Sequence, residues 1–344
     1  MPKRLSVSEY IDGIRQGIRS VRGRSTLARS ISLVESKLPS DRQLATQLME
    51  NIMEHTGKAM RIGITGVPGV GKSTTIDNLA MLLIEKGHTV AVLAIDPSSA
   101  VSGGSILGDK TRMHQVSVHP HAFVRPSPTD TYLGGVARKT RESILLCEAS
   151  GCDIILVESV GVGQSEILLS SMVDCFVALM LPNAGDELQG IKKGLLEMVD
   201  IVAINKSDGE NRLSAEKARK EYQTALHYTA RKYTGWQVPV LLISGLYNTG
   251  MDALWEGIQT HHTQIQENGL LQKQRSQQQV EWLRTAMQDR LWEIFRENPD
   301  LQEMWKEKAH NVENGTEHVG KAVDELVVEF MQSWSPSISP KEPR

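Results

Sequence analysis

Short apolar segments alternate with helical stretches through the middle of the chain. Between positions 61 and 243 the sequence carries six segments rich in β-branched residues, and the stretches between them have helical periodicity. The predicted strands are Arg61–Thr65, Thr89–Ile95, Ile154–Val157, Cys175–Leu181, Ile201–Asn205 and Val238–Ile243. Strands that alternate with helices form a mostly parallel sheet whose two faces are covered by those helices. The pattern therefore predicts an α/β fold.

Both ends of the chain carry a helical pattern without strand signals. Residues 8–36 and 41–56 place apolar side chains at three- and four-residue spacing, which predicts two or three amphipathic helices. After about residue 264 the sequence becomes Gln-rich and charged, again with helical periodicity. We predict an N-terminal helical segment (1–57), a central α/β domain (58–264) and a C-terminal helical arm (265–344). The pattern leaves open whether the arm packs on the chain's own core or pairs with a second subunit.

Composition and charge exclude several classes of partner. The 344 residues carry a formal net charge of −3 and no long Lys/Arg block, so we expect no nucleic-acid partner. The longest apolar runs are far shorter than the roughly 18 residues of a membrane span, which predicts a soluble protein without a membrane partner. Three cysteines without a C-x-x-C pair predict neither a disulfide framework nor a zinc ribbon, and they fit the cytoplasm.

The N-terminus leaves one alternative open. It is rich in Arg and Ser, as organelle transit peptides are. Three acidic residues, Glu9, Asp12 and Glu35, interrupt it, and its periodicity favours a folded segment.

A phosphate-binding motif follows the first predicted strand. The segment reads G-V-P-G-V-G-K-S, the G-x-x-x-x-G-K-[ST] pattern, and a predicted helix follows it. Glycines let successive backbone N–H groups surround phosphates, the lysine places a cation on the β and γ oxygens, and the serine hydroxyl suits Mg²⁺. The predicted nucleotide-binding residues here are Gly66, Val67, Pro68, Gly69, Val70, Gly71, Lys72, Ser73 and Thr74. The central domain is therefore predicted to be a P-loop NTPase domain.

A base-reading motif follows the fifth predicted strand. Asn205, Lys206 and Asp208 match the N-K-x-D pattern of GTPases. A carboxylate at Asp208 can accept hydrogen bonds from guanine N1–H and the 2-amino group, whereas adenine offers an acceptor at N1. The segment Ser244, Gly245 and Leu246 follows the last predicted strand and is placed to contact the other side of the base. These residues predict GTP and GDP as ligands, with ATP bound much more weakly.

Carboxylates for a magnesium site occur at three predicted positions. Glu158 and Gly161 form E-S-V-G, a variant of the D-x-x-G element in which the acidic side chain holds Mg²⁺ and the glycine N–H contacts the γ-phosphate. Asp96 ends the second predicted strand, and Asp109 lies in the polar stretch 98–112. For Asp109 alone, an ordinary loop aspartate is the competing interpretation.

Hydrolysis without a partner is predicted to be slow. The residue after Gly161 is Val162, where Ras-like proteins place the glutamine that orients water. Gln164 lies close enough in sequence to substitute, or a partner supplies the missing group. The polar loop 183–190 leads to Lys192 and is a candidate additional switch.

Six motifs occur in order along the chain: G-V-P-G-V-G-K-S, A-I-D-P-S-S, G-D-K-T-R-M, V-E-S-V-G-V-G-Q-S-E, G-D-E-L-Q-G-I-K-K-G and I-N-K-S-D. Together they resemble the MeaB/ArgK family of GTPases. The resemblance runs from about residue 30 to about residue 260. It implies a SIMIBI-class homodimer with a C-terminal dimerisation arm. It also implies a chaperone of adenosylcobalamin-dependent methylmalonyl-CoA mutase or a related mutase, in which GTP binding and hydrolysis gate cofactor loading and protect the mutase.

The same resemblance implies roles for individual residues. Lys72 and Ser73 bind phosphate and Mg²⁺, and Asn205, Lys206 and Asp208 read guanine. The residues implied to shape the metal and hydrolysis site are Asp96, Asp109 and Glu158. Gln189 and Lys192 fall in the additional switch loop of the family.

Two other functions compete with this interpretation. A nickel metallochaperone GTPase needs imidazole or thiolate ligands, and the sequence has no Cys-rich or His-rich tract. His114, His119 and His121 cluster, but their spacing is more typical of solvated polar sequence. A small-molecule phosphotransferase needs an acceptor pocket, for which the sequence gives no signal. Stoichiometric nickel or zinc binding favours the first alternative, and phosphate transfer to an acceptor favours the second.

Overall fold

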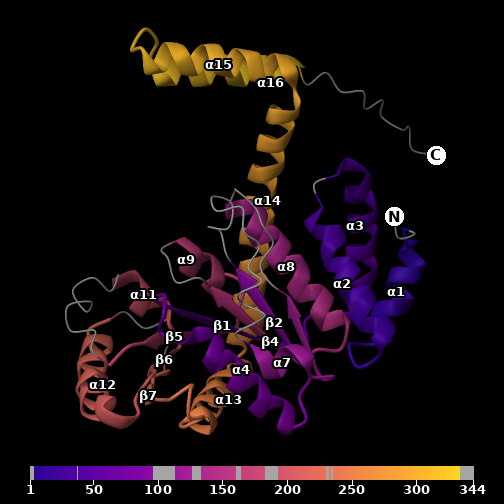
Figure 1. Ribbon diagram of the computed structural model, residues 1–344. Helices are drawn as coiled ribbons and strands as arrows, with labels where there is room; N and C mark the ends of the chain where they lie inside the picture. Colours follow the sequence, from indigo (N-terminus) through magenta and orange to yellow (C-terminus); the bar gives the residue numbers. More distant parts are fainter. Residues whose placement is uncertain are drawn as a thin grey trace. The chain divides into compact units, whose positions relative to one another are not determined.

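The computed structural model describes residues 4–36, 38–95, 113–125, 133–159, 164–182, 193–229, 232–233 and 235–333 (Figure 1). The chain divides into two compact units, Met1–Gln279 and Val280–Arg344. The predicted segment boundaries at 57/58 and 264/265 follow changes in composition, and they stay predictions.

The first unit is built on a seven-stranded parallel sheet with the strand order β3-β2-β4-β1-β5-β6-β7. The strands are β1 Met60–Gly66, β2 Val90–Ile95, β3 Ala122–Arg125, β4 Ile154–Ser159, β5 Cys175–Met180, β6 Ile201–Ile204 and β7 Val240–Leu242. The predicted α/β fold with a mostly parallel sheet is confirmed, and each of the six predicted strands is present within two residues at either end. β3 was not predicted, because four residues behind a polar segment give too short a pattern.

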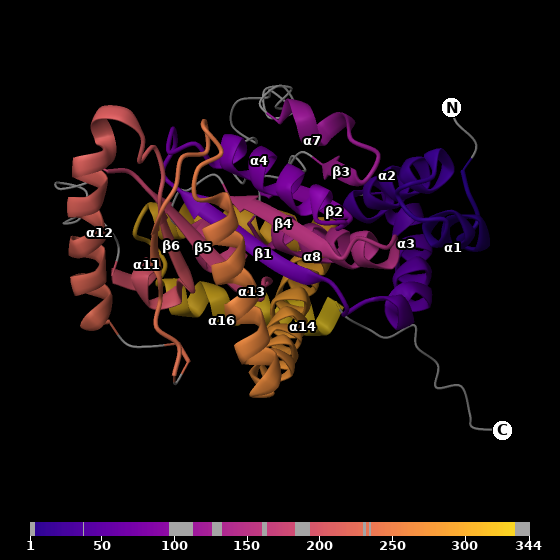
Figure 2. The same ribbon diagram turned by 90° about the horizontal axis from the view of Figure 1, so that it is seen from below.

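Helices cover both faces of the sheet, which explains why its central strands read as continuous apolar runs. Side chains alternate between the faces along each strand: in β4, Ile155 and Val157 pack in one core, and Ile154 and Leu156 pack in the other. The first core is completed by α8 (Leu133–Ala149), α9 (Gln164–Ser170), α11 (Lys193–Met198), α12 (Arg212–His227) and the N-terminal helices. The second is completed by α4 (Lys72–Glu85), α7 (His114–Val118) and α13 (Met251–Glu267). Figure 2 shows α12 beside one edge of the sheet and the N-terminal helices beside the other.

The N-terminal helices are α1 (Val7–Arg15), α2 (Val21–Glu35) and α3 (Pro39–Ile52), followed by a short turn of 3₁₀-helix, η1 (Met53–His55). Ser6 and Glu9 form a reciprocal capping box that starts α1. α1 and α2 approach closely where Gly13 faces Thr26, since a Cβ at Gly13 would lie 2.3 Å from Thr26 Oγ1. The amphipathic helices expected from the N-terminal pattern are present, and they pack on α8.

The second unit is helical in its described part. It contains residues 280–297 of α14 (Leu270–Glu297), together with α15 (Pro299–Glu313) and α16 (Val319–Ser333). Its small core consists of Phe295, Leu301 and Leu326 with Met304 and Phe330 against them. No helix among the described residues of either unit combines the length and the apolar character needed to cross a bilayer.

Candidate active site

The loop between β1 and α4 has the backbone that a phosphate-binding loop requires. Gly66, Gly69 and Gly71 have φ values of 151°, 79° and 98°, which L side chains rarely adopt. Two of these positions are also tightly enclosed: a Cβ at Gly66 would lie 2.5 Å from Leu179 O, and one at Gly71 would lie 2.6 Å from Asn205 Nδ2. These glycines are therefore fixed by both conformation and packing.

Lys72 is the first residue of α4 and is buried inside this loop. Its Nζ donates to Gly66 O at 2.8 Å and to Val67 O at 3.3 Å. The ammonium group thus lies within the ring of backbone that would surround the phosphates, at the positively polarised end of a 14-residue helix.

The structure brings Ser73 and Glu158 together from different elements. Ser73 Oγ donates to Glu158 Oε1 at 3.2 Å. Glu158 reaches this position because β1 and β4 are neighbours, with Ile64 in register with Glu158. A hydroxyl and a carboxylate next to each other are oxygen ligands of the kind that Mg²⁺ prefers. The sequence motifs contain these two residues but do not show that they are in contact.

Asn205 connects the phosphate loop to the base-reading loops. Its Nδ2 donates to Val70 O at 2.8 Å and to Thr75 Oγ1 at 3.3 Å, and its Oδ1 accepts from Gly245 N at 2.8 Å. Asn78 Nδ2 donates to Gly245 O from α4. We call Asn205, Thr75, Asn78 and Gly245 the loop clasp. Asn205 is only 3% exposed, so it holds two loops together rather than facing an open site.

Asp208 is positioned by the segment that follows β7. Ser244 Oγ donates to Asp208 Oδ1 at 2.6 Å, and Tyr247 N donates to Ser244 Oγ at 3.3 Å. Lys206 is exposed and has a φ of 58°, a left-handed conformation that sharply turns the chain after β6. Leu246 is 73% exposed. The two base-reading segments predicted from the sequence are therefore adjacent, at the same edge of the sheet as the phosphate loop.

Several predicted site residues lie outside the described residues. They are Asp96, Asp109, Gly161, Gln189 and Lys192. Gln164 begins α9, but its side chain also lies outside the description. Of the histidine cluster, His119 and His121 lie with ring centroids 5.6 Å apart, and His114 begins α7. None of the three belongs to a metal-compatible group of three ligands within the described part of the chain.

Sequence reasoning missed Thr75 and Asn78. Both follow the phosphate-binding motif on α4, and both contact residues about 130 or more positions away in the chain. A polar pair on the buried side of a helix was the available signal, but its partners cannot be read from local spacing.

Residues 27–300 match the model of a family described as Methylmalonyl Co-A mutase-associated GTPase MeaB. The chain belongs to this family. GTPase ArgK of Escherichia coli (strain K12) is 46% identical over 311 residues, covering 90% of this chain and 92% of that protein. The mitochondrial methylmalonic aciduria type A homolog of Mus musculus is 41% identical over 332 residues, covering 93% of this chain and 80% of that protein. The crystal structure of an LAO/AO transport system kinase is similar to this chain with a TM-score of 0.73 at 38% identity, covering 96% of this chain and 99% of that one.

Membership of the MeaB family confirms the resemblance drawn from the motifs. The protein is a GTPase and binds guanine nucleotide. In this MeaB-family GTPase the phosphate loop, the Ser73–Glu158 pair and the base-reading loops lie at the carboxyl edge of one parallel sheet, where ligands bind in open α/β folds.

Proposed function

We propose that this GTPase is a chaperone that gates adenosylcobalamin loading into methylmalonyl-CoA mutase, or a related B12-dependent acyl-CoA mutase, and protects that enzyme. The single observation that carries the proposal is the match of residues 27–300 to a family described as mutase-associated. The name of the mouse relative, methylmalonic aciduria type A homolog, supports the same connection. A cytoplasmic location is proposed with it, since three buried free cysteines suit a reducing compartment.

GTP binding begins with an exchange of partners at Lys72. Its Nζ exchanges the carbonyl oxygens of Gly66 and Val67 for the β and γ phosphate oxygens. The cation moves little, and negatively charged partners replace neutral ones. At the other end, the Asp208 carboxylate accepts from guanine N1–H and the 2-amino group while Ser244 holds its Oδ1. The loop clasp keeps the distance between these two ends fixed.

The residues present fit a magnesium ion. Ser73 Oγ and Glu158 Oε1 are 3.2 Å apart and both are oxygen donors, as Mg²⁺ requires. Ser73 and Glu158 would hold the ion, with Asp96 and Asp109 as further carboxylates. When bound, Mg²⁺ neutralises charge on the β and γ phosphates. Glu158 is enclosed at the end of β4, so its carboxylate stays aimed at this position.

Hydrolysis is proposed to be slow until the client binds. Val162 cannot orient a water molecule, and Gln164, at the start of α9, is the proposed substitute. Gly161 N–H and Lys192 are proposed to contact the γ-phosphate region. A protein partner that positions the missing catalytic group would raise the rate, which is the behaviour of a switch rather than of a metabolic enzyme.

The gating step is proposed to move segments 98–112 and 183–192 with nucleotide state, which changes how the protein holds its client. The test is the rate of adenosylcobalamin transfer to the mutase with GDP or with a non-hydrolysable GTP analogue bound. We expect the two nucleotides to give different transfer rates and client affinities. Equal values for both would rule out gating and leave a guanine-binding protein with another role.

A homodimer is part of the proposal, and the second unit supplies the supporting surface. On α16, Val319, Val323, Val327 and Met331 recur every four residues and are 57%, 49%, 48% and 70% exposed. On α14, Val280, Leu283, Met287 and Leu291 form a second exposed series at heptad-like spacing. Apolar stripes of this length on helices mark surfaces that another chain covers.

A further inference from the structure

A second group of chemically active side chains lies at the amino edge of the sheet, opposite the phosphate loop. Cys175 begins β5, Asp200 precedes β6, and His261 is on α13. One ligand atom from each lies within 4.8 Å of the other two, and this is the one such group of three in the part of the chain that the structure describes. All three residues are fully buried, at 0% exposure.

Asp200 is held rigidly and points one oxygen into the group. Its Oδ2 accepts from Phe176 N at 2.8 Å, and its backbone oxygen accepts from Trp236 Nε1 at 2.8 Å. Its Oδ1 lies 3.4 Å from His261 Nε2. The carboxylate is therefore held by the Phe176 N–H of β5, and the Asp200 backbone by Trp236, rather than by the imidazole.

The His261 imidazole is enclosed but poorly satisfied. Neither Nδ1 nor Nε2 makes a hydrogen bond within the described residues, since the contact to Asp200 lacks hydrogen-bond geometry. The ring packs against Trp236 and Tyr233, with centroids 4.9 and 5.8 Å away. A fully buried imidazole with both nitrogens unused is costly, and it indicates a ligand that uses one of them.

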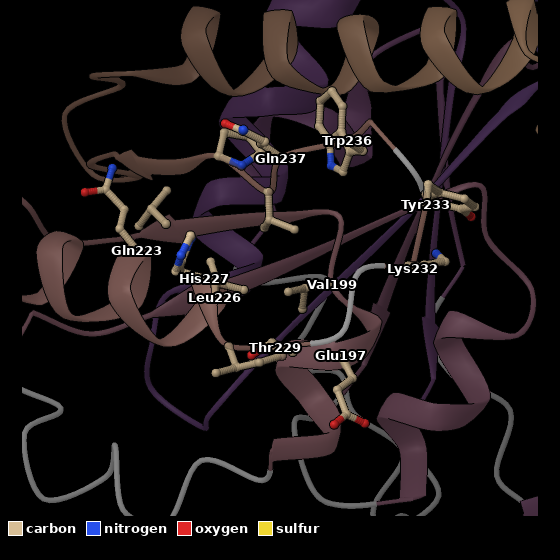
Figure 3. Close-up of a pocket in the computed structure, with 14 residues that line it drawn as sticks. Glu197, Val199, Gln223, Leu226, His227, Thr229, Lys232, Tyr233, Trp236 and Gln237 are labelled. Atoms are coloured by element: carbon tan, nitrogen blue, oxygen red, sulfur yellow. The ribbon is translucent and has the colours of Figure 1, made fainter.

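Lys232 is the cation that currently balances Asp200. Its Nζ lies 3.0 Å from Oδ2 and 3.2 Å from Oδ1. Burial lowers the pKa of Lys232, but the Asp200 carboxylate and the Tyr233 hydroxyl together raise it by more, and the net shift is upward. The lysine side chain is 27% exposed and lines a cavity of about 400 Å³ together with Tyr233 and Trp236 (Figure 3). It therefore has space into which it can withdraw.

We propose that Cys175, Asp200 and His261 form a binding site for a zinc ion, with Lys232 as the exchangeable cation that occupies the carboxylate when zinc is absent. A thiolate, an imidazole and a carboxylate are the donor set that zinc prefers. Zinc–ligand bonds of about 2.0–2.3 Å place donor atoms about 3.5 Å apart. Asp200 Oδ1 and His261 Nε2 already lie 3.4 Å apart, and the Cys175 ligand atom lies within 4.8 Å of its partners. Water from the adjoining cavity completes four ligands.

The charges of the site sum to zero both without zinc and with zinc bound. Without zinc, the neutral Cys175 thiol, the Asp200 carboxylate and the Lys232 ammonium sum to zero. On binding, the S–H bond of Cys175 breaks, its proton goes to solvent, the S–Zn bond forms, and Lys232 moves into the cavity. Thiolate, carboxylate and Zn²⁺ again sum to zero, so the buried site never carries a net charge.

The test is zinc binding to the full-length, chelator-treated protein, measured by competition with a chromophoric chelator in the presence of GDP and Mg²⁺. We expect one zinc per chain, at least about 10-fold weaker binding in Cys175→Ser, and unchanged binding in the control Cys147→Ser. Cys147 is a buried free cysteine outside the group. Lys232→Gln should bind zinc more tightly than the unaltered chain, because the competing cation is gone.

Cobalt substitution gives a readout that does not depend on affinity alone. Co²⁺ bound through Cys175 produces a thiolate-to-metal charge-transfer band, which Cys175→Ser should lose and Cys147→Ser should keep. Absence of stoichiometric zinc binding would overturn the proposal. So would binding of one zinc that persists unchanged in Cys175→Ser and His261→Gln, which would place the metal at another site such as the His119–His121 pair.

Discussion

Nucleotide choice depends on one carboxylate, that of Asp208. Replacing it in Asp208→Asn leaves an amide where guanine presents two donors, so GTP affinity should fall by at least about 100-fold. The amide can donate to a carbonyl at the 2-position, so xanthosine triphosphate should bind the variant better than GTP does. Nucleotide titration by calorimetry measures both. Unchanged GTP affinity would show that Asp208 does not contact the base.

The folding stability of the first unit is predicted to depend on pH through Glu142 on α8. Burial raises the pKa of Glu142 to about 7, although Arg138 and Lys139 oppose the shift. In the unfolded chain the carboxyl ionises near pH 4.3, so stability falls as pH rises from about 4.3 to about 7. Glu142→Gln removes this loss and should stabilise the protein at pH 8 by up to about 3 kcal/mol, with no gain near pH 4.

Thermal midpoints across this pH range test the Glu142 prediction. The matched control is Glu256→Gln on α13, because Glu256 is exposed. The prediction would be contradicted if the difference in thermal midpoint between Glu142→Gln and the unaltered chain stayed constant with pH.

At the residue scale, the sequence motifs identified the residues that bind the phosphates and the base, but not the contacts that those residues make with one another. Lys72, Ser73, Asn205 and Asp208 carry recognisable spacing, so their chemistry could be predicted. The contact of Asn205 with Val70 and Gly245 depends on loops that are distant in sequence. Which side chains meet across a fold is decided by packing, and no local pattern encodes it.

At the element scale, the loop clasp should couple the two halves of the nucleotide site. A Cβ at Gly245 would lie 2.6 Å from Thr75 Oγ1 and 3.2 Å from Thr75 N, so Gly245→Ala must push the base loop away from α4. We expect a loss of about 1–3 kcal/mol in stability and weaker GTP binding. The control is Gly194→Ala on α11, where a Cβ meets no atom of the described residues within 4 Å. Equal nucleotide affinity in both variants would contradict the coupling.

The strands that could be predicted from the sequence are those whose side chains are buried on both faces of the sheet. β4 and β5 are buried along their full length, so their apolar runs are continuous and their existence was predictable. β3 has four residues, two of them only partly buried, and follows His119-Pro120-His121. β7 begins at Val240 rather than at the predicted Val238, because Pro239 has no N–H for the ladder.

At the scale of the whole molecule, the exposed stripe on α16 should mediate self-association. The double variant Val323→Glu/Val327→Glu places two charges on that stripe and should convert a dimer to a monomer in light scattering. Lys306→Glu adds a glutamate at an exposed polar position of α15 and should leave the mass unchanged. A monomeric unaltered chain, or a double variant that stays dimeric, would contradict the proposed dimer surface.

The boundary between the two compact units could not be predicted from sequence periodicity. Composition changes near residue 264, whereas the compact units meet at Gln279 and Val280, inside α14. The first ten residues of α14 remain with the sheet through contacts such as Arg275 to Asp174 and Gln278 to Val173. A helical pattern shows that a helix forms, but not with which core each of its turns packs.

The most direct test of the mutase-chaperone proposal is hydrolysis of GTP and ATP by the purified protein, with and without an adenosylcobalamin-dependent mutase. Lys72→Ala is the inactive control, expected to lose at least about 100-fold in rate, and Lys86→Ala at the far end of the same helix is its active counterpart. We predict slow, GTP-selective turnover that rises when the mutase is added. GTP turnover that no such mutase changes would contradict the proposed function while leaving the protein a GTPase.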